Sequence, residues 1–204
     1  MGLREIKKER ARRAILETAR EMFFSHGFDG TTIEAIARKA EVAVGTVYNY
    51  FDSKSTLILA ITAEDTSTLL DSKFQIRESC TGCESVKLYI NTFMESLSMY
   101  PKRLLRELMR EGWRSDTTLS KRFINQDITL LDGLAGILRE LAAKQKIKPA
   151  TDIEHASLAI YGIITTALMW YAADEERTSV QMLESLEKML EILFLGLSPE
   201  GRDR

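Results

Sequence analysis

The segment from Thr31 to Lys54, TTIEAIARKAEVAVGTVYNYFDSK, constrains the fold of this chain more than any other. Its first half predicts a short helix over 32–40, because apolar residues recur there at helical spacing. These residues are Ile33, Ile36, Ala37 and Ala40. Thr31 is the expected N-cap, since Glu34 follows three residues later and completes a capping box. Glu41 and Val42 are expected to form a tight turn before a second helix over 43–50.

The second helix is expected to have two contrasting faces. Helical periodicity turns Val42, Val47 and Phe51 inward. The outer face is neutral, compact and rich in hydrogen-bonding groups: Val44, Gly45, Thr46, Tyr48, Asn49 and Tyr50. Eight residues make a helix about 12 Å long, and the major groove of B-DNA, about 12 Å wide, admits one α-helix. We interpret the segment as a helix-turn-helix. A hairpin that only packs is the alternative, but packing explains neither the exposed tyrosines nor the exposed glycine.

Each residue of the outer face suits a particular contact with DNA. Gly45 lets the backbone come close, and the Val44 methyls, Thr46 and Asn49 have the size to reach base edges or a thymine methyl. Tyr48 and Tyr50 carry hydroxyl groups on long rigid arms, which suits phosphate oxygens. Lys54 is expected at the start of the next helix, where Asp52 or Ser53 is the cap. It would present a cation and free backbone N–H groups to the sugar-phosphate chain.

The run from Phe28 to Leu57 resembles the DNA-binding domain of TetR-type transcriptional regulators, with GFDGTTIEAIA near its start and GTVYNYFDSKSTL at its end. Beyond about the first sixty residues only length and helical pattern agree. The resemblance implies that phosphates are held by Thr32, Tyr48 and Lys54. It implies a groove-facing set of Val44, Gly45, Thr46, Asn49 and Tyr50, and a core set of Val42, Val47 and Phe51. Two residues depart from the family pattern. Ala43 stands where a Ser or Thr cap is common, and Val44 where many members have a polar or basic residue, so base reading would lean on apolar contact.

Charge is distributed unevenly along the chain. The net charge of -2 argues at first against nucleic acid, but residues 1–54 carry ten Lys/Arg against eight Asp/Glu. Most of the basic residues lie in the first thirteen: Arg4, Lys7, Lys8, Arg10, Arg12 and Arg13. A basic arm on an otherwise acidic protein indicates phosphate binding, although a solvated helix start is the alternative. The charged N-terminus lacks the apolar core of a signal peptide, so we expect a cytoplasmic protein.

We expect an all-α fold with two domains: a three-helix DNA-binding domain over 1–52 and a larger helical effector-binding and dimerisation domain over 53–204. The core of the first domain is predicted to contain Ile15, Phe23, Ile36, Val47 and Phe51. Residues 156–173 contain no charge, a length at which a transmembrane helix must be considered. We favour a fully buried helix and expect no membrane partner. The last two helices, 156–173 and 180–197, are more apolar than one small body can cover, so we expect them to pair with their twins in a homodimer.

The functional prediction is a dimeric DNA-binding regulator of a palindromic operator. By family resemblance it is a repressor released by a small, largely apolar effector. Candidate effector residues are the aromatic and neighbouring side chains of the middle helices: Tyr89, Phe93, Trp113, Phe123, Tyr161, Thr165 and Met169. A helical ligand-binding protein, or an activator without repressor activity, is the alternative. An enzyme is not expected, because the sequence has no Gly-rich phosphate loop, paired-His metal motif or Ser nucleophile elbow.

No cofactor and no metal are expected. Cys80 and Cys83 form a CTGC motif, which can be a redox pair or half of a zinc site. No second pair exists, and the two histidines, His26 and His155, are distant in sequence. We therefore interpret the cysteines as two reduced thiols, with a redox role left open.

Overall fold

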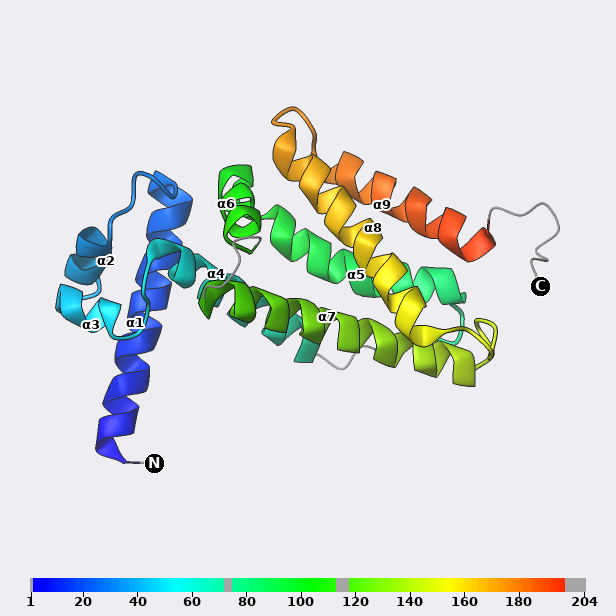
Figure 1. Ribbon diagram of the computed structural model, residues 1–204, viewed down its shortest axis with the longest axis horizontal. Helices are drawn as coiled ribbons and strands as arrows, with labels where there is room; N and C mark the ends of the chain where they lie inside the picture. The colour runs from blue at the N-terminus through cyan, green and yellow to red at the C-terminus, as the bar shows by residue number, and fades with distance from the viewer. Residues whose placement is uncertain (1, 72–74, 113–117, 197–204) are drawn as a thin grey trace. The chain divides into compact units, whose positions relative to one another are not determined.

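The computed structural model describes residues 2–71, 75–112 and 118–196, and in these ranges the chain forms nine helices and no strand (Figure 1). The first four helices are α1 (Leu3–His26), α2 (Ile33–Lys39), α3 (Val44–Tyr48) and α4 (Lys54–Asp71). The next five are α5 (Gly82–Ser98), α6 (Lys102–Gly112), α7 (Thr118–Ala143), α8 (Ile153–Ala173) and α9 (Ser179–Leu195). The all-α fold expected from the sequence is confirmed.

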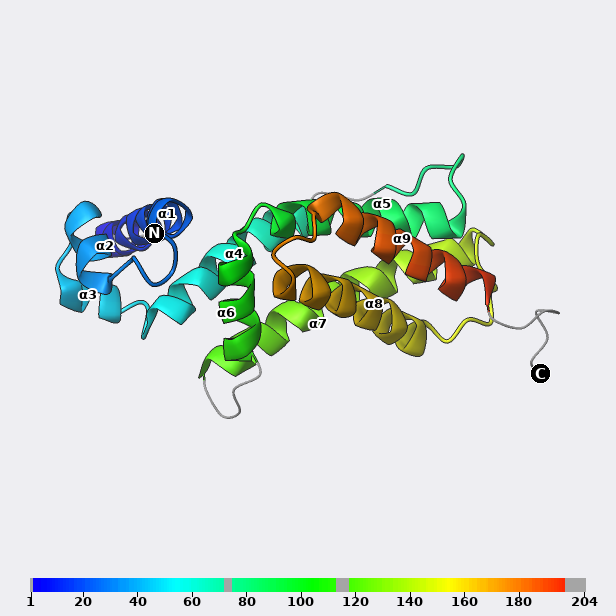
Figure 2. The same ribbon diagram turned by 90° about the horizontal axis from the view of Figure 1, so that it is seen from above.

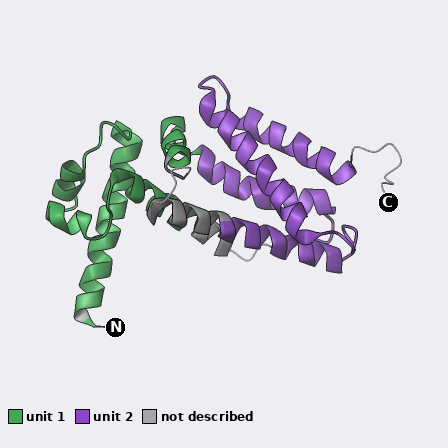
Figure 3. Cartoon of the chain, in the orientation of Figure 1, with its two compact units in different colours: residues 1–66, 99–124 green, residues 67–98, 125–204 purple. Residues whose placement is uncertain are grey.

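The chain divides into two compact units that are not continuous in sequence (Figure 3). Unit 1 contains residues 1–66 and 99–124, and unit 2 contains residues 67–98 and 125–204. Unit 1 therefore holds α6 as well as the helix-turn-helix. The predicted division into domains after residue 52 stays a prediction.

The predicted core of the DNA-binding domain is present in unit 1. Its five residues are at most 2% exposed: Ile15, Phe23, Ile36, Val47 and Phe51. The ring of Phe23 stacks on that of Phe28, with centroids 5.6 Å apart, just beyond the C-cap Gly27. Gly27 has a φ of 73°, a conformation that glycine adopts without strain. This turn brings the chain back onto α1 and leads into α2.

The predicted cap of α2 is wrong by one residue. Thr32, not Thr31, is the N-cap, and its hydroxyl accepts a hydrogen bond from the Ala35 N–H at 3.1 Å. Thr31 is fully buried, and its hydroxyl reaches the carbonyl oxygens of Met22 and Gly27. Thr31 therefore fastens the loop to α1, and Glu34 forms no capping box with it.

In unit 2, α9 packs against both α5 and α8, as Figures 1 and 2 show. Its inner side is apolar and buried, with Met182, Leu186 and Leu190 fully enclosed. A single chain does not bury the uncharged stretch all round, because several apolar side chains of α8 are about half exposed. These are Leu158 at 48%, Met169 at 52% and Trp170 at 58%. The predicted full burial depends on pairing with a second copy and stays a prediction.

Among the described residues, α8 is the one helix long and apolar enough to cross a membrane by length and composition. A third of its most apolar stretch is buried within the chain. The core helix of a soluble protein passes the same criteria, so this is weak support for a membrane span.

Candidate nucleic-acid interface

The turn between α2 and α3 is tight and left-handed at one residue. Glu41 has a φ of 56°, and the Val42 N–H donates to the Ala37 carbonyl at 2.9 Å. A non-glycine residue in this region marks a backbone held by its surroundings. The helix that follows is shorter than predicted: α3 spans Val44–Tyr48 rather than 43–50. Ala43 is its N-cap and supplies no side-chain hydrogen bond, as expected from the sequence.

The two faces of α3 differ as the sequence predicts. Val47 is fully buried and Phe51 is 2% exposed, while Val42 is half-buried. Gly45 and Asn49 are both exposed and lie one helical turn apart, on the side away from Val47. Tyr48 is 48% exposed and Val44 36% exposed, whereas Thr46 is half-buried. The outer surface of this helix is therefore neutral and accessible.

Gly45 has no reason within the chain to be glycine. It is a helical residue, its φ is not positive, and a Cβ built on it would meet no atom within 4 Å. Glycine in a helix costs about 1 kcal/mol relative to alanine. A residue that weakens its own helix and leaves open space beside it fits a surface that another molecule approaches closely.

The three residues expected to hold phosphates lie at element ends. Thr32 is the N-cap of α2, and its Oγ1 accepts from Ala35 while the contacts described do not use its hydroxyl proton. Lys54 is the first residue of α4, beside Ser53, whose hydroxyl accepts from the Thr56 N–H at 3.2 Å. The Lys54 ammonium lies 4.5 Å from the centre of the Phe28 ring, and donates to the Phe28 carbonyl at 2.6 Å. Burial lowers the pKa of Lys54. A phosphate contact by its side chain would have to replace that hydrogen bond, and this role stays a prediction.

Tyr50, which follows α3, connects the helix-turn-helix to the basic N-terminal arm by a hydrogen bond. Its hydroxyl donates to the carbonyl oxygen of Lys8 in α1 at 3.0 Å. In this state the hydroxyl is used within the chain, so its predicted place in the groove stays untested. The bond places the N-terminal half of α1 beside the helix-turn-helix. Four exposed cations of that half make no ion pair within the described part of the chain: Arg4, Lys7, Lys8 and Arg10.

A cluster of charged side chains, which the sequence did not predict, holds α1 against α4. The Arg20 guanidinium binds Asp65 with both terminal nitrogens, each at 2.6 Å, and Arg12 binds Glu64 at 2.7 Å. Tyr100, 3% exposed and next to α6, donates a short hydrogen bond to the same Asp65 carboxylate. Burial and that carboxylate raise the pKa of Tyr100, and the hydrogen bond to Asp65 raises the pKa of Arg20. We call Arg20, Asp65 and Tyr100 the Asp65 cluster.

Five of the predicted effector residues belong to unit 2, and they line no described pocket. Tyr89 is 8% exposed, and its hydroxyl occupies the space beside Gly133 of α7; burial raises its pKa to about 12. Phe93, Tyr161 and Thr165 are half-buried, and Met169 is exposed. Trp113 and the side chain of Phe123 lie outside the described residues. The effector assignment stays a prediction.

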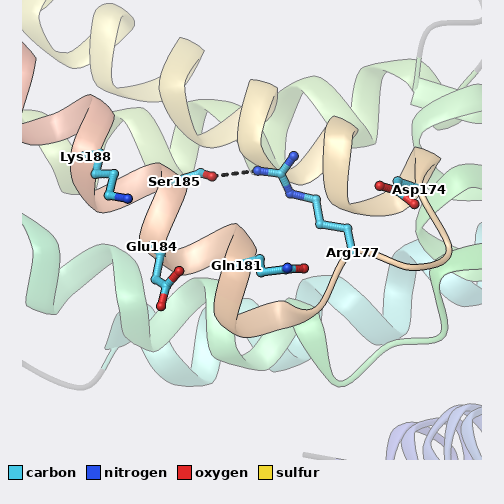
Figure 4. Close-up of a pocket in the computed structure, with 6 residues that line it drawn as sticks. All are labelled: Asp174, Arg177, Gln181, Glu184, Ser185 and Lys188. Carbon is cyan, nitrogen blue, oxygen red and sulfur yellow. Dashed lines mark hydrogen bonds between the residues drawn. The ribbon is translucent and has the colours of Figure 1, made fainter.

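A polar pocket of about 350 Å³ lies where α8 turns into α9 (Figure 4). It is lined by Asp174, Arg177, Gln181, Glu184, Ser185 and Lys188. Arg177 crosses it, donating to the Ser185 hydroxyl at 2.6 Å and lying 5.8 Å from the Trp170 ring centre. None of the predicted effector residues lines this pocket, and its charged walls do not suit an apolar ligand.

Neither cysteine is in a disulfide, and burial raises the pKa of the Cys83 thiol above its ordinary value. A raised pKa lowers the thiolate fraction on which redox reactivity depends. Across the described ranges, no group of three or more His, Cys, Asp or Glu side chains is arranged to hold a metal ion.

The short α3 has a buried inner face and an accessible neutral outer face, and it packs against α2, which packs against α1. This arrangement defines a helix-turn-helix DNA-binding protein. The family described as bacterial regulatory proteins, tetR family, matches residues 15–61, which run from the core of α1 into α4. Residues 15–61 therefore match the DNA-binding domain of the TetR family of transcriptional regulators.

Two relatives and one solved structure are similar to this chain over most of its length. UidR of Escherichia coli, an HTH-type transcriptional regulator, is 25% identical over 88% of this chain and 90% of its own. The fatty acid metabolism regulator protein of Bacillus subtilis is 26% identical over 90% of this chain and 93% of its own. The crystal structure of the TetR-family repressor FadR of Thermus thermophilus, in complex with lauroyl-CoA, has a TM-score of 0.77. It is 23% identical and covers 95% of this chain and 97% of its own, which is a likeness of fold.

Proposed function

We propose that this chain is a homodimeric transcriptional repressor that reads a palindromic operator with α3 and is released by a small, largely apolar effector. It would act in the cytoplasm on double-stranded DNA, with no enzymatic role. The observation that carries the DNA-binding part is Gly45. It is exposed on the outer face of a helix, leaves open space where a side chain would fit, and has Tyr48 and Asn49 exposed nearby.

The homodimer is supported by the apolar surface that one chain leaves uncovered. Leu158, Met169 and Trp170 of α8 are each about half exposed, and Val180, Ile192 and Leu195 of α9 are between 51% and 80% exposed. Large apolar side chains left exposed in this number support an interaction site on α8 and α9. A two-fold axis would present two α3 helices to successive major grooves, as a palindromic operator requires.

The effector class is supported by the named relatives as well as by composition. One relative regulates fatty acid metabolism, and the Thermus repressor of the same fold was crystallised with lauroyl-CoA. We therefore propose an acyl-chain ligand, such as a long-chain acyl-CoA, for the aromatic residues Tyr89, Phe93 and Tyr161. Such a ligand releases DNA only if it binds the DNA-free state more tightly than the DNA-bound state.

Gly45→Ala tests the DNA-binding part. Duplexes enriched by the wild type from a random library supply the probe, and affinity is measured at several salt concentrations. The added methyl group should cut affinity about tenfold or more by keeping the backbone away from DNA, while thermal stability stays equal or rises. Gly136→Ala is the matched control, because Gly136 is also an exposed helical glycine with no atom near its Cβ position. Equal DNA binding by both variants and the wild type would contradict the role of α3.

Release is tested with the same probe. Lauroyl-CoA should displace the protein from DNA, while coenzyme A without the acyl chain should not. If acyl-CoA esters of every chain length leave the complex intact, the acyl-chain assignment fails, and the DNA-binding part stands on its own test.

A further inference from the structure

The exposed face of α3 contains no cation. Its accessible residues, together with its flanking caps, are Ala43, Val44, Gly45, Tyr48 and Asn49. The commonest specific contact to a guanine is a bidentate Arg or Lys bound to its O6 and N7 atoms. The cations closest to this face in sequence are Arg38 and Lys39 before it and Lys54 after it. Lys39 is paired with Glu21 at 2.7 Å, and Lys54 donates to the Phe28 carbonyl at 2.6 Å. The chemistry of α3 therefore lacks the usual means of selecting a G·C pair.

Asn49 has the chemistry to select adenine. It is the C-cap of α3, with helical backbone angles, and is exposed on the same side as Gly45. None of the hydrogen bonds described within the chain uses its side-chain amide, which is thus available to an external partner. A carboxamide pairs in bidentate fashion with the N6 and N7 atoms of adenine. Gly45, one turn earlier and without a side chain, lets the backbone come near enough for this short side chain to reach.

Val44 has the chemistry to select thymine. It is the first residue of α3, it is 36% exposed, and its methyl groups follow the exposed methyl of Ala43. Apolar side chains in the major groove contact the C5-methyl group of thymine. An exposed valine at a helix start contributes no burial free energy to the fold. Contact with the thymine methyl group removes apolar surface of both partners from water, which is favourable.

Resting on the proposed function, we infer that each α3 reads A·T pairs, with Asn49 bonded to an adenine and Val44 packed on a thymine methyl. The operator half-site is then A·T-rich where α3 enters the groove. Any G·C pair of the half-site lies outside that position.

The test combines a binding selection with an atom-level substitution in DNA. The wild-type protein selects duplexes from a random library, and the centre of each half-site should be A·T pairs. In a selected duplex, each thymine is then replaced in turn by deoxyuridine, in both half-sites, which removes only the methyl group. One such position should lower wild-type affinity about threefold to fourfold per half-site, and the Val44→Ala variant should show no loss there.

A parallel measurement isolates Asn49. Replacing the contacted adenine by 7-deazaadenine removes the N7 acceptor of the proposed bidentate contact. In the protein, Asn49→Ala should relax the preference for adenine at that position by about tenfold to a hundredfold. Melting curves that match the wild type establish that both variants fold, since both side chains are exposed.

Three outcomes would overturn the inference. They are half-site centres of G·C pairs, uracil tolerated at every position, or a full uracil penalty retained by Val44→Ala. A G·C centre that is lost in Arg38→Ala would assign base reading to the end of α2 instead. Failure of the proposed function looks different, because then no duplex is enriched and no salt-dependent binding is seen.

Discussion

Two helices of this protein expose side chains that the packing of a single chain does not use, and the two exposures differ in kind. On α3 the exposed side chains are short or can form hydrogen bonds, and Gly45 leaves empty space where a side chain would lie. On α8 they are large and apolar, with Trp170 58% exposed. The first surface suits a hydrated polar ligand approached at close range, and the second suits another apolar surface. This difference in the chemistry of the exposed surface is why we propose DNA as the partner of α3 and a second copy of the chain as the partner of α8.

The contrast extends to how the two regions are held together. The helix-turn-helix is braced through α1 by charge-assisted hydrogen bonds, from Arg20 to Asp65 and from Arg12 to Glu64. Around α8 and α9 the buried contacts are mostly apolar, for example Ile160, Ile164 and Leu186. Directional hydrogen bonds fix an orientation, whereas apolar packing mainly supplies free energy of burial. Substitutions in the two regions should therefore have different consequences.

The largest effect is expected from the α8 face. Leu158→Glu combined with Trp170→Glu places two charges on the surface proposed to meet its twin, so the protein should become monomeric. Operator affinity should then fall about a hundredfold or more, because one dimer no longer binds both half-sites at once. Sedimentation velocity and DNA titration measure the two results.

The matched control for that double variant is Arg139→Glu on the exposed side of α7, which adds a carboxylate elsewhere in unit 2. It should leave both the dimer and the affinity unchanged. A double variant that stays dimeric would place the subunit interface on another surface and remove the contrast between α3 and α8.

A smaller effect is expected in the Asp65 cluster. Asp65→Ala leaves the Arg20 guanidinium and the buried Tyr100 hydroxyl without their acceptor, which should cost about 1–3 kcal/mol. For a chain of this size each kcal/mol lowers Tm by roughly 2–4 °C. Differential scanning calorimetry measures the change.

The control for the Asp65 cluster is Glu17→Ala. It removes the Arg13–Glu17 pair, whose side chains are 78% and 64% exposed, and should not change Tm measurably. Equal Tm values for the two variants would show that the cluster does not brace α1 against α4. The contrast between a helix-turn-helix held by charged hydrogen bonds and an apolar core around α8 and α9 would then fail.

The sequence predicted what depends on local order and missed what depends on distant partners. Val47 and Phe51 were placed in the core by helical spacing alone, and both are buried. Thr31 and Thr32 are adjacent and chemically identical, so the carbonyls of Met22 and Gly27, nine and four residues before Thr31, decide which of them is the cap. The partners Arg20 and Asp65 lie 45 residues apart, and no spacing rule connects them.

The candidate site shows the same limit. The outer face of α3 could be predicted as neutral, but the open space beside Gly45 appears only when its neighbours are in place. On α8 an uncharged stretch carries no periodic signal, so the sequence could not tell its exposed side from its buried side.

The smallest effect is expected from the edge of the α3 surface, where contact with DNA is proposed to involve phosphate rather than bases. Tyr48→Phe removes one hydroxyl from an exposed ring, so it should weaken binding to every duplex by the same factor, about twofold to tenfold. Thr46→Ala is the matched comparison, because it also removes a hydroxyl from α3 and should change the ranking of duplexes instead. Affinities for a panel of single-base operator variants separate the two patterns. A Tyr48→Phe protein with altered ranking and intact average affinity would move base reading to the tyrosine, and the division of α3 into base-reading and phosphate-holding residues would have to be redrawn.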